Sequence, residues 1–302
     1  MIYDIIIIGG GPAGLVAALY ARRARKSVLV IEKAGFGGQI TYSPKVENIP
    51  GFCELSGNEF AEKLVDQVIN QGADFESAEV FSVKTGDIKT VVTDSGEYKA
   101  KAVIVATGAK HRRLGLERED KFIGEGISFC AVCDGAFYLD KTVAVIGGGN
   151  SALQEALLLS DQAKKVYVIQ NLDFLTGEAA LQQALAKKNN VEIILGSVLD
   201  AYLGENEITG VRVKREATGE LSEISLDGVF LAIGLVPQNE PFADVITLDG
   251  RGYADTDESC VAGEGVFVAG DCRAKRIRQV TTAAADGAVA ALAACDYVDS
   301  LN

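Results

Sequence analysis

Two cysteines separated by two residues, Cys130 and Cys133, form the pattern in this sequence that is best suited to chemistry, and Asp134 follows them directly. Cysteines at this spacing can close a disulfide and reopen it by thiol–disulfide exchange. A neighbouring carboxylate can deliver or accept the proton that the exchange requires. The alternatives are half of a zinc site and a pair of buried thiols. Zinc needs about four ligands, but the chain has no second Cys-x-x-Cys and one histidine, His111. Redox chemistry is therefore favoured, and no metal site is predicted.

The composition restricts the partners and the setting of this chemistry. The chain has 302 residues, of which 48% are hydrophobic and 24% charged, which is typical of a soluble protein with two domains. A net charge of −13 makes nucleic acid a poor partner. The apolar run 283–294 is too short to span a bilayer, and no export signal precedes the first strand, so we expect a cytoplasmic protein. In a reducing compartment the other cysteines are expected to be buried thiols: Cys53, Cys260, Cys272 and Cys295.

A glycine-rich turn near the start of the chain indicates a nucleotide site. A strand at 5–8 leads into Gly9-Gly-Gly-Pro-Ala-Gly14, and a helix and a second strand, ending on Glu32, follow. The glycines at 9, 11 and 14 allow a tight turn, and the N-terminus of the helix accepts a pyrophosphate. Glu32 lies 32 − 11 = 21 positions after the middle glycine, where an acid can bind ribose hydroxyls. This segment therefore predicts a dinucleotide-binding βαβ unit.

The same order of elements occurs a second time. A strand at 142–146, the turn Gly147–Ala152, a helix at 150–160 and a strand at 165–169 form another unit, which ends on Gln170. Two such units predict an α/β fold with two Rossmann-like, three-layer domains built on parallel sheets.

The later strands indicate how the two domains are connected. Each unit continues with a strand that ends in a glycine turn, at 103–108 and at 229–234. The chain then returns to a strand that ends on Asp271 and to an alanine-rich helix at 281–297. The second domain is therefore expected to be inserted into the first, with residues 1–113 and 242–302 in one domain and 114–241 in the other.

With these motifs in place, the sequence resembles the low-molecular-weight thioredoxin reductases over nearly its whole length. The matching stretches are Gly9–Gly14, Gly37–Gln39, Val46–Asn48, Ala106–Gly108, Cys130–Gly135, Gly147–Ala152, Gly270–Asp271 and Arg278–Gln279. The resemblance implies FAD in the first unit, with Glu32 on the adenosine ribose, Asp271 on the ribityl chain and Arg278–Val280 against the flavin. The residues that it places along the cofactor are Gly9, Gly11, Pro12, Ala13, Gly14, Glu32, Lys33, Gly38, Gln39, Asn48, Val80, Ala106, Thr107, Gly108, Gly270, Asp271, Arg278, Gln279 and Val280.

The resemblance also gives the cysteines separate roles. Cys133 is expected to face the flavin, Cys130 to attack the disulfide of thioredoxin, and Asp134 to transfer the proton. The resemblance further implies a homodimer.

The sequence departs from the family where NADPH-using members carry His-Arg-Arg-x-x-x-Arg. The corresponding residues here, 170–176, are Gln-Asn-Leu-Asp-Phe-Leu-Thr, without a positive charge. A 2′-phosphate needs charge-assisted donors, so this departure favours the ferredoxin-dependent flavin branch of the family. Ferredoxin has a reduction potential near −400 mV and thioredoxin one near −270 mV, so passing two electrons from the first to the second releases roughly 6 kcal/mol of free energy. Two alternatives are NADH or NADPH bound at an atypical site, and a flavin redox sensor that does not turn over.

An acidic ferredoxin needs a local basic surface on a chain of this net charge. Three segments, 22–26, 110–113 and 273–278, contain clustered cations. The last two adjoin segments assigned to the flavin, so we expect docking there, with Lys275 and Arg276 taking part. The alternative is that these cations form a solvated surface or contact the FAD phosphates.

Overall fold

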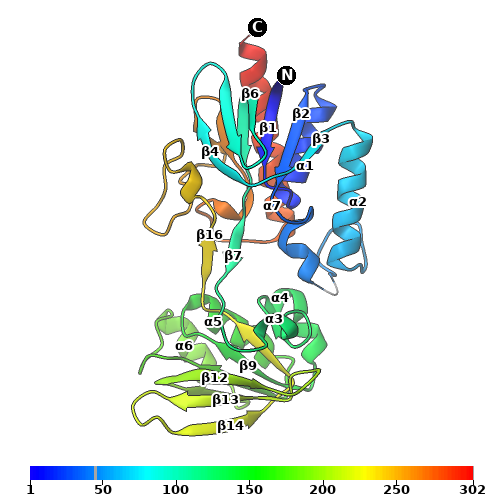
Figure 1. Ribbon diagram of the computed structural model, residues 1–302. Helices are drawn as coiled ribbons and strands as arrows, with labels where there is room; N and C mark the ends of the chain where they lie inside the picture. The colour runs from blue at the N-terminus through cyan, green and yellow to red at the C-terminus, as the bar shows by residue number, and fades with distance from the viewer. Residues whose placement is uncertain (44–45, 302) are drawn as a thin grey trace. The chain divides into compact units, whose positions relative to one another are not determined.

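The computed structural model describes residues 1–43 and 46–301 and divides into two compact units (Figure 1). Unit 1 comprises Met1–Lys110 with Val236–Asn302, and unit 2 is His111–Leu235. These boundaries lie a few residues from the expected crossings at 113/114 and 241/242. Within the described ranges, no helix is long and apolar enough to cross a membrane.

Unit 1 is built on an eight-stranded sheet whose central strands are parallel. Strand β1 (Ile2–Ile8) lies between β2 (Val28–Glu32) and β6 (Glu97–Val105), and β6 is followed by β18 (Val266–Val268). Ile8 pairs with Ile31 of β2 and with Val105 of β6, and Val105 also pairs with Val268 of β18. The carboxyl ends of these strands therefore meet at one edge, and the segments that follow them are brought together there. The sheet contains β17 (Val261–Gly263), β18 (Val266–Val268), β6 (Glu97–Val105), β1 (Ile2–Ile8), β2 (Val28–Glu32) and β3 (Asp74–Ser77). In addition, β5 (Lys89–Thr93) pairs antiparallel with β6, and β4 (Val80–Lys84) pairs antiparallel with β5.

Alternation along β1 divides the core of unit 1 between the two faces of this sheet. Ile5 and Ile7 pack with the helices, whereas Ile6 and Ile8 pack in a second cluster with Phe242 and Ile246. This is the period-two pattern of a strand buried on both faces. The helical elements are α1 (Pro12–Arg23), α2 (Gly57–Asn70), α7 (Val280–Ser300), η1 (Gly38–Tyr42), η3 (Glu240–Phe242) and η4 (Gly270–Cys272).

Unit 2 repeats the architecture with a smaller sheet. Its five parallel strands run in the order β11 (Val191–Ile194), β10 (Lys165–Ile169), β9 (Thr142–Ile146), β15 (Gly228–Leu231) and β8 (Ile127–Ser128). The remaining strands are β12 (Ser197–Leu203), β13 (Gly210–Arg215) and β14 (Leu221–Ser225), which form an antiparallel sheet. Its helical elements are α3 (Glu119–Phe122), α4 (Ala131–Asp134), η2 (Gly135–Tyr138), α5 (Asn150–Ser160) and α6 (Ala179–Leu185).

The chain crosses between the units at β7 (Ala109–His111) and β16 (Leu235–Pro237). The prediction of an α/β fold with two Rossmann-like domains is confirmed.

Candidate active site

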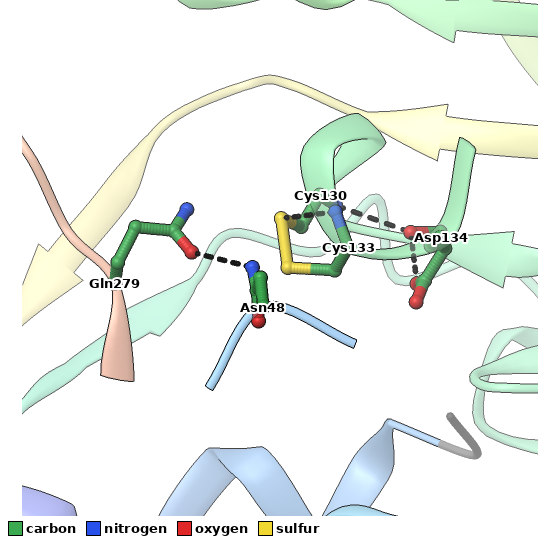
Figure 2. The surroundings of a disulfide bond; sticks show 6 residues. Asn48, Cys130, Cys133, Asp134 and Gln279 are labelled. Atoms are coloured by element: carbon green, nitrogen blue, oxygen red, sulfur yellow. Dashed lines mark hydrogen bonds between the residues drawn. A yellow bond between two sulfur atoms is a disulfide. The ribbon is translucent and has the colours of Figure 1, made fainter. Parts of the chain in front are cut away.

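The redox pair lies where β8 ends and α4 begins. Cys130 and Cys133 form a disulfide, with their Cα atoms 5.3 Å apart (Figure 2). The first turn of α4 fixes this arrangement, because the Cys133 and Asp134 N–H groups both donate to the Cys130 carbonyl oxygen, at 3.1 and 3.0 Å. The Cys133 N–H also lies 3.2 Å from Cys130 Sγ. The two sulfur atoms are thereby held together at the start of α4.

Asp134 is connected to the pair through a buried hydroxyl. Ser128 Oγ donates to Asp134 Oδ2 at 2.6 Å and accepts from the Cys130 N–H at 3.1 Å. The other carboxylate oxygen, Asp134 Oδ1, is buried without a hydrogen-bond partner. Burial raises the pKa of Asp134 above its usual value, and the hydrogen bond from Ser128 opposes this rise. Asp134 is therefore suited to holding a proton beside the disulfide.

The first glycine turn leaves backbone groups available to a ligand. Gly9 has φ +111°, and a Cβ atom there would lie 2.3 Å from the Ala106 carbonyl oxygen. A Cβ atom on Gly14 would lie 1.9 Å from the Gly9 carbonyl oxygen, so only glycine fits at either position. Helix α1 begins directly after Gly11 without a side-chain cap, which leaves its first N–H groups to bind an anion.

A second loop approaches this turn closely. A Cβ atom on Gly38 would lie 3.1 Å from Gly11 Cα, so two backbones face each other without side chains. Glu32 accepts hydrogen bonds from the N–H groups of Gly10 and Ala34, at 2.7 and 2.8 Å. Its carboxylate is thereby fixed beside the turn, where the sequence predicts ribose binding.

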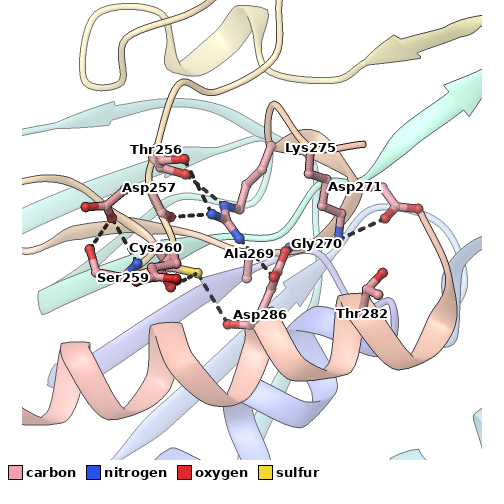
Figure 3. Close-up of polar contacts among 12 residues, drawn as sticks. Thr256, Asp257, Ser259, Cys260, Ala269, Gly270, Asp271, Lys275, Thr282 and Asp286 are labelled. Atoms are coloured by element: carbon pink, nitrogen blue, oxygen red, sulfur yellow. Dashed lines mark hydrogen bonds and ion pairs between the residues drawn. The ribbon is translucent and has the colours of Figure 1, made fainter. Parts of the chain in front are cut away.

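Asp271 belongs to a buried network of charges (Figure 3). Its Oδ1 lies 3.4 Å from Lys275 Nζ, but this buried oxygen makes no hydrogen bond. Lys275 Nζ also lies 3.0 Å from Asp286 Oδ2, and Arg273 lies 2.8 Å from the same carboxylate. Asp286 Oδ2 accepts in addition from the Gly270 N–H at 3.0 Å. Burial raises the pKa of Asp271, and Lys275 opposes that rise.

Other predicted cofactor residues in unit 1 make contacts with their own surroundings. Arg278 stacks over Tyr253 at 4.3 Å, and Arg278 Nε donates to the Asp271 carbonyl oxygen at 3.3 Å. Asn48 Nδ2 donates to Gln279 Oε1 at 3.2 Å (Figure 2). Two further residues of this set form polar contacts: Gln39 donates to the Ala109 carbonyl oxygen, and Lys33 forms an ion pair with Glu79. Gly270 packs on Ala13, Val80 is buried, and Val280 is the first residue of α7.

Asn239 was missed by the sequence analysis. Its side chain is fully buried and donates to the carbonyl oxygens of Gly252 and Cys272, while Thr107 Oγ1 lies 3.3 Å from its Oδ1. It therefore holds the segment that contains Thr107. An asparagine that soon follows the hydrophobic crossing strand was the available signal, but its partners lie too far along the chain to be inferred.

In unit 2, the segment after β10 folds back onto the second glycine turn. The Thr176 and Gly177 N–H groups donate to the Gly148 carbonyl oxygen at 2.8 and 2.9 Å. A Cβ atom on Gly149, the middle glycine, would lie 3.7 Å from Thr176 Oγ1. Gln170 is buried and donates to the Phe174 carbonyl oxygen at 3.5 Å. The segment is thus hydrogen-bonded to the turn that it adjoins.

Two expectations are wrong. Cys53 is exposed, whereas Cys260, Cys272 and Cys295 are buried as expected. Arg273 and Lys275 do not belong to an open basic surface, because Arg273 is buried, Lys275 is largely covered, and both form ion pairs with Asp286. Their charges are compensated inside unit 1, and in 273–278 only Arg276 is an exposed cation.

Comparisons with known proteins agree with this arrangement. Residues 3–287 match the family model described as pyridine nucleotide-disulphide oxidoreductase. A thioredoxin reductase of Listeria monocytogenes is 40% identical, over 100% of this chain and 95% of that protein. A "34.2 kDa protein in rubredoxin operon" of Clostridium pasteurianum is 42% identical, over 98% and 97%. The crystal structure of thioredoxin reductase from Streptococcus pyogenes superimposes with a TM-score of 0.93 at 38% identity, covering 99% of both chains.

The chain belongs to the pyridine nucleotide-disulphide oxidoreductase family. Within it, the chain is a member of the low-molecular-weight thioredoxin reductase family.

FAD is the cofactor of this family, and the residues of unit 1 fit it. The side-chain-free approach of Gly11 and Gly38 and the uncapped start of α1 fit a pyrophosphate. Asp271 Oδ1 makes no hydrogen bond within the protein, so it fits a sugar hydroxyl as its donor. Among the described residues, no group of side chains could hold a metal ion.

Proposed function

We propose that this protein passes electrons from FAD in unit 1 to the Cys130–Cys133 disulfide, and from the resulting dithiol to the disulfide of thioredoxin. The observation that carries the proposal is the disulfide with the half-buried Asp134 beside it. The relatives named thioredoxin reductases support thioredoxin as the substrate.

The chain's own residues account for the exchange with thioredoxin. When bound, FAD would supply the two electrons with which the Cys130–Cys133 bond opens to a dithiol. The Cys130 thiolate then attacks one sulfur of thioredoxin, so that a mixed disulfide forms as the thioredoxin disulfide breaks. Cys133 next attacks Cys130 Sγ, which restores the enzyme disulfide and releases the second thioredoxin sulfur. The proton that Cys130 loses on becoming a thiolate passes to the first departing thioredoxin sulfur. Asp134 takes the proton of the Cys133 thiol and gives it to the second departing sulfur, so two electrons and two protons reach thioredoxin.

A single-turnover experiment tests this proposal. The protein is reduced anaerobically with one equivalent of dithionite and mixed with oxidised thioredoxin, and free thioredoxin thiols are counted after quenching. We expect about one reduced thioredoxin for each wild-type protein and almost none for Cys130→Ser. Cys53→Ser is the matched control, because Cys53 is the exposed thiol outside the pair. Equal yields from wild type and Cys130→Ser would show that the pair does not carry the electrons.

We further propose ferredoxin as the electron donor. Three features support it: residues 170–176 carry no cation, the Gln170 amide is buried, and Thr176 lies against the middle glycine of the turn. A nucleotide 2′-phosphate would find no charged donor on this segment, and a ribose would compete with the hydrogen bonds of Thr176 and Gly177 to Gly148. The family description favours the alternative, a pyridine nucleotide bound at an atypical site.

Stopped-flow absorbance at the flavin band distinguishes these donors. The oxidised protein is mixed anaerobically with NADPH, NADH or chemically reduced ferredoxin in separate experiments. Rapid bleaching by ferredoxin alone is the expected result. Rapid bleaching by either nucleotide would overturn the ferredoxin assignment without affecting the thioredoxin half-reaction.

Of the basic segments 110–113 and 273–278, we propose that only the exposed cations dock ferredoxin. In unit 1 these are Lys110, which lies on β7, and Arg276. Charge reversal of each should weaken ferredoxin turnover most at low salt, because surface attraction is screened as salt rises. Unchanged turnover and salt dependence would exclude this surface.

We also propose a cytoplasmic homodimer, which cell fractionation and light scattering on the purified protein would test.

A further inference from the structure

Ser128 occupies a position that the exchange chemistry described above does not explain. It is the last residue of β8, only 5% exposed, and it pairs in register with Phe230 of β15. Its hydroxyl makes two hydrogen bonds in one direction: the Cys130 N–H donates to Oγ, and Oγ donates to Asp134 Oδ2. Cys130, which directly precedes α4, and Asp134, which ends it, are thus joined through the Ser128 side chain.

This arrangement determines which oxygen of the acid is free. Ser128 engages Oδ2 at 2.6 Å, while Oδ1 is buried without a partner. A hydroxyl that donates to a carboxylate stabilises its charged form, whereas burial stabilises its neutral form. The two effects oppose each other at Asp134, so the hydroxyl limits how tightly the acid holds its proton.

We propose that Ser128 is a positioning residue for the Asp134 acid, holding one carboxylate oxygen so that the other exchanges the proton with the sulfur atoms of Cys130 and Cys133. This inference rests on the proposed function, because it concerns the proton that moves from the Cys133 thiol to a departing thioredoxin sulfur. Ser128 itself neither gains nor loses a bond to sulfur, and its hydroxyl proton stays on Oγ.

The elements that pack against α4 carry other titratable groups, which the pH profile must separate from Asp134. Tyr138 on η2 has a pKa raised to about 12, by burial and by the charge of Asp134, so it stays neutral through the working range. Lys141 Nζ lies 5.6 Å from the centre of the Tyr138 ring. Glu155 on α5 has a pKa raised to about 8 by burial, and its titration must be separated from that of Asp134.

The first measurement compares pH profiles of the single-turnover oxidation by thioredoxin. The proteins are wild type and the variants Ser128→Ala, Ser128→Thr, Asp134→Asn and Glu155→Gln, each loaded with FAD. The limb of the profile that is absent from Asp134→Asn belongs to Asp134. In Ser128→Ala we expect that limb to move upward by about one to two pH units, the equivalent of a hydrogen bond to a charged group. Ser128→Thr keeps the hydroxyl and should restore the wild-type midpoint, and Glu155→Gln should retain the limb.

A second measurement follows the acid directly, without thioredoxin. The infrared carboxyl band that is missing from Asp134→Asn is titrated in the oxidised protein, in wild type and in Ser128→Ala. An upward shift of its midpoint in Ser128→Ala supports the inference. The same midpoint in both proteins overturns it, as does a Ser128→Ala variant whose rates fall equally at every pH, because a merely structural role would have that effect.

The two experiments separate failure of this inference from failure of the proposed function. If Asp134→Asn keeps both limbs and full rate, the proposed role of Asp134 as the acid is wrong, yet the infrared midpoint still decides whether Ser128 controls its proton. If Asp134→Asn loses a limb that Ser128→Ala leaves in place, the acid is confirmed and the role of Ser128 is overturned.

Discussion

Replacement of Asp286 by Asn tests whether the buried charges behind Asp271 stabilise unit 1. Asp286 neutralises two cations that are largely covered, Arg273 at 2.8 Å and Lys275 at 3.0 Å. The side chain of Asp286 is 16% exposed, that of Arg273 8% and that of Lys275 14%. Asparagine has nearly the same size and can still accept from the Gly270 N–H, so the change removes the charge with little loss of packing. Arg273 would then lie buried without a carboxylate.

The expected loss follows from the balance between attraction and desolvation. With an effective dielectric constant of about 20, each pair contributes roughly 5–6 kcal/mol of attraction before the cost of desolvation. Breaking a buried pair by removing one partner typically costs about 3–5 kcal/mol. Because Lys275 keeps Asp271 and Arg273 keeps its hydrogen bonds to Thr256 and Asp257, we expect the lower end, about 3 kcal/mol.

Urea denaturation at a fixed excess of FAD measures this loss, with FAD fluorescence reporting on unit 1 and circular dichroism on the whole chain. Glu97→Gln is the matched control, because its pair with Lys84 is exposed, at 52% and 64%, and such pairs contribute at most about 1 kcal/mol. The reasoning is refuted if Asp286→Asn costs no more free energy of unfolding than Glu97→Gln.

Three further predictions concern the pair, the glycine turn and a buried acid. Cys133→Ser should stop the exchange at a covalent complex between Cys130 and thioredoxin, detected by mass spectrometry; absence of that complex would contradict the assignment of Cys130 as the attacking thiol. Gly14→Ala should lose FAD on gel filtration, because its Cβ would lie 1.9 Å from a carbonyl oxygen, whereas Gly250→Ala, with open space around it, should retain FAD. Burial raises the pKa of Glu155 from 4.5 to about 8, so the folded protein keeps a proton that the unfolded chain releases, and stability should fall as pH rises from 4.5 to 8 and then level off. Glu155→Gln should remove this fall in the free energy of unfolding, which is at most about 5 kcal/mol. The prediction is contradicted if the urea midpoint depends on pH in the same way in wild type and in Glu155→Gln.

The sequence predicted the elements whose signals are local. Strands β9 and β10 and helix α5 have the predicted bounds, because an apolar run, a glycine turn and a helical repeat are all read within a short window. The first glycine turn was predicted for the same reason, since backbone sterics alone require glycine at 9 and 14.

Residues whose partners are distant in the sequence were not predicted. Asp286 lies on α7, where an acid within an alanine-rich helix looks like a surface residue. Its role depends on Arg273 and Lys275, which lie on a segment before the helix, and only the fold brings these charges together. Lys275 was misassigned for the same reason, because clustered cations indicate an exposed surface until their buried partners are known. Ser128 lies within the stretch singled out for chemistry, but a serine six positions before an acid has no distinctive spacing.

The second glycine turn shows why a motif alone does not define a ligand. Gly147–Ala152 meets the sequence pattern of a dinucleotide site, yet tight packing requires the same glycines: a Cβ on Gly147 would lie 2.6 Å from the Ala232 carbonyl oxygen. The two features that bear on binding lie outside the motif, in the uncharged residues 170–176 and in the hydrogen bonds of Thr176 and Gly177 to Gly148. The lack of cations removes electrostatic attraction for a phosphate, and the hydrogen bonds to Gly148 compete with a nucleotide for the turn. Because these effects are independent, restoring positive charge by itself would leave the competition in place. The packing at this turn therefore accounts for its glycines without requiring a nucleotide.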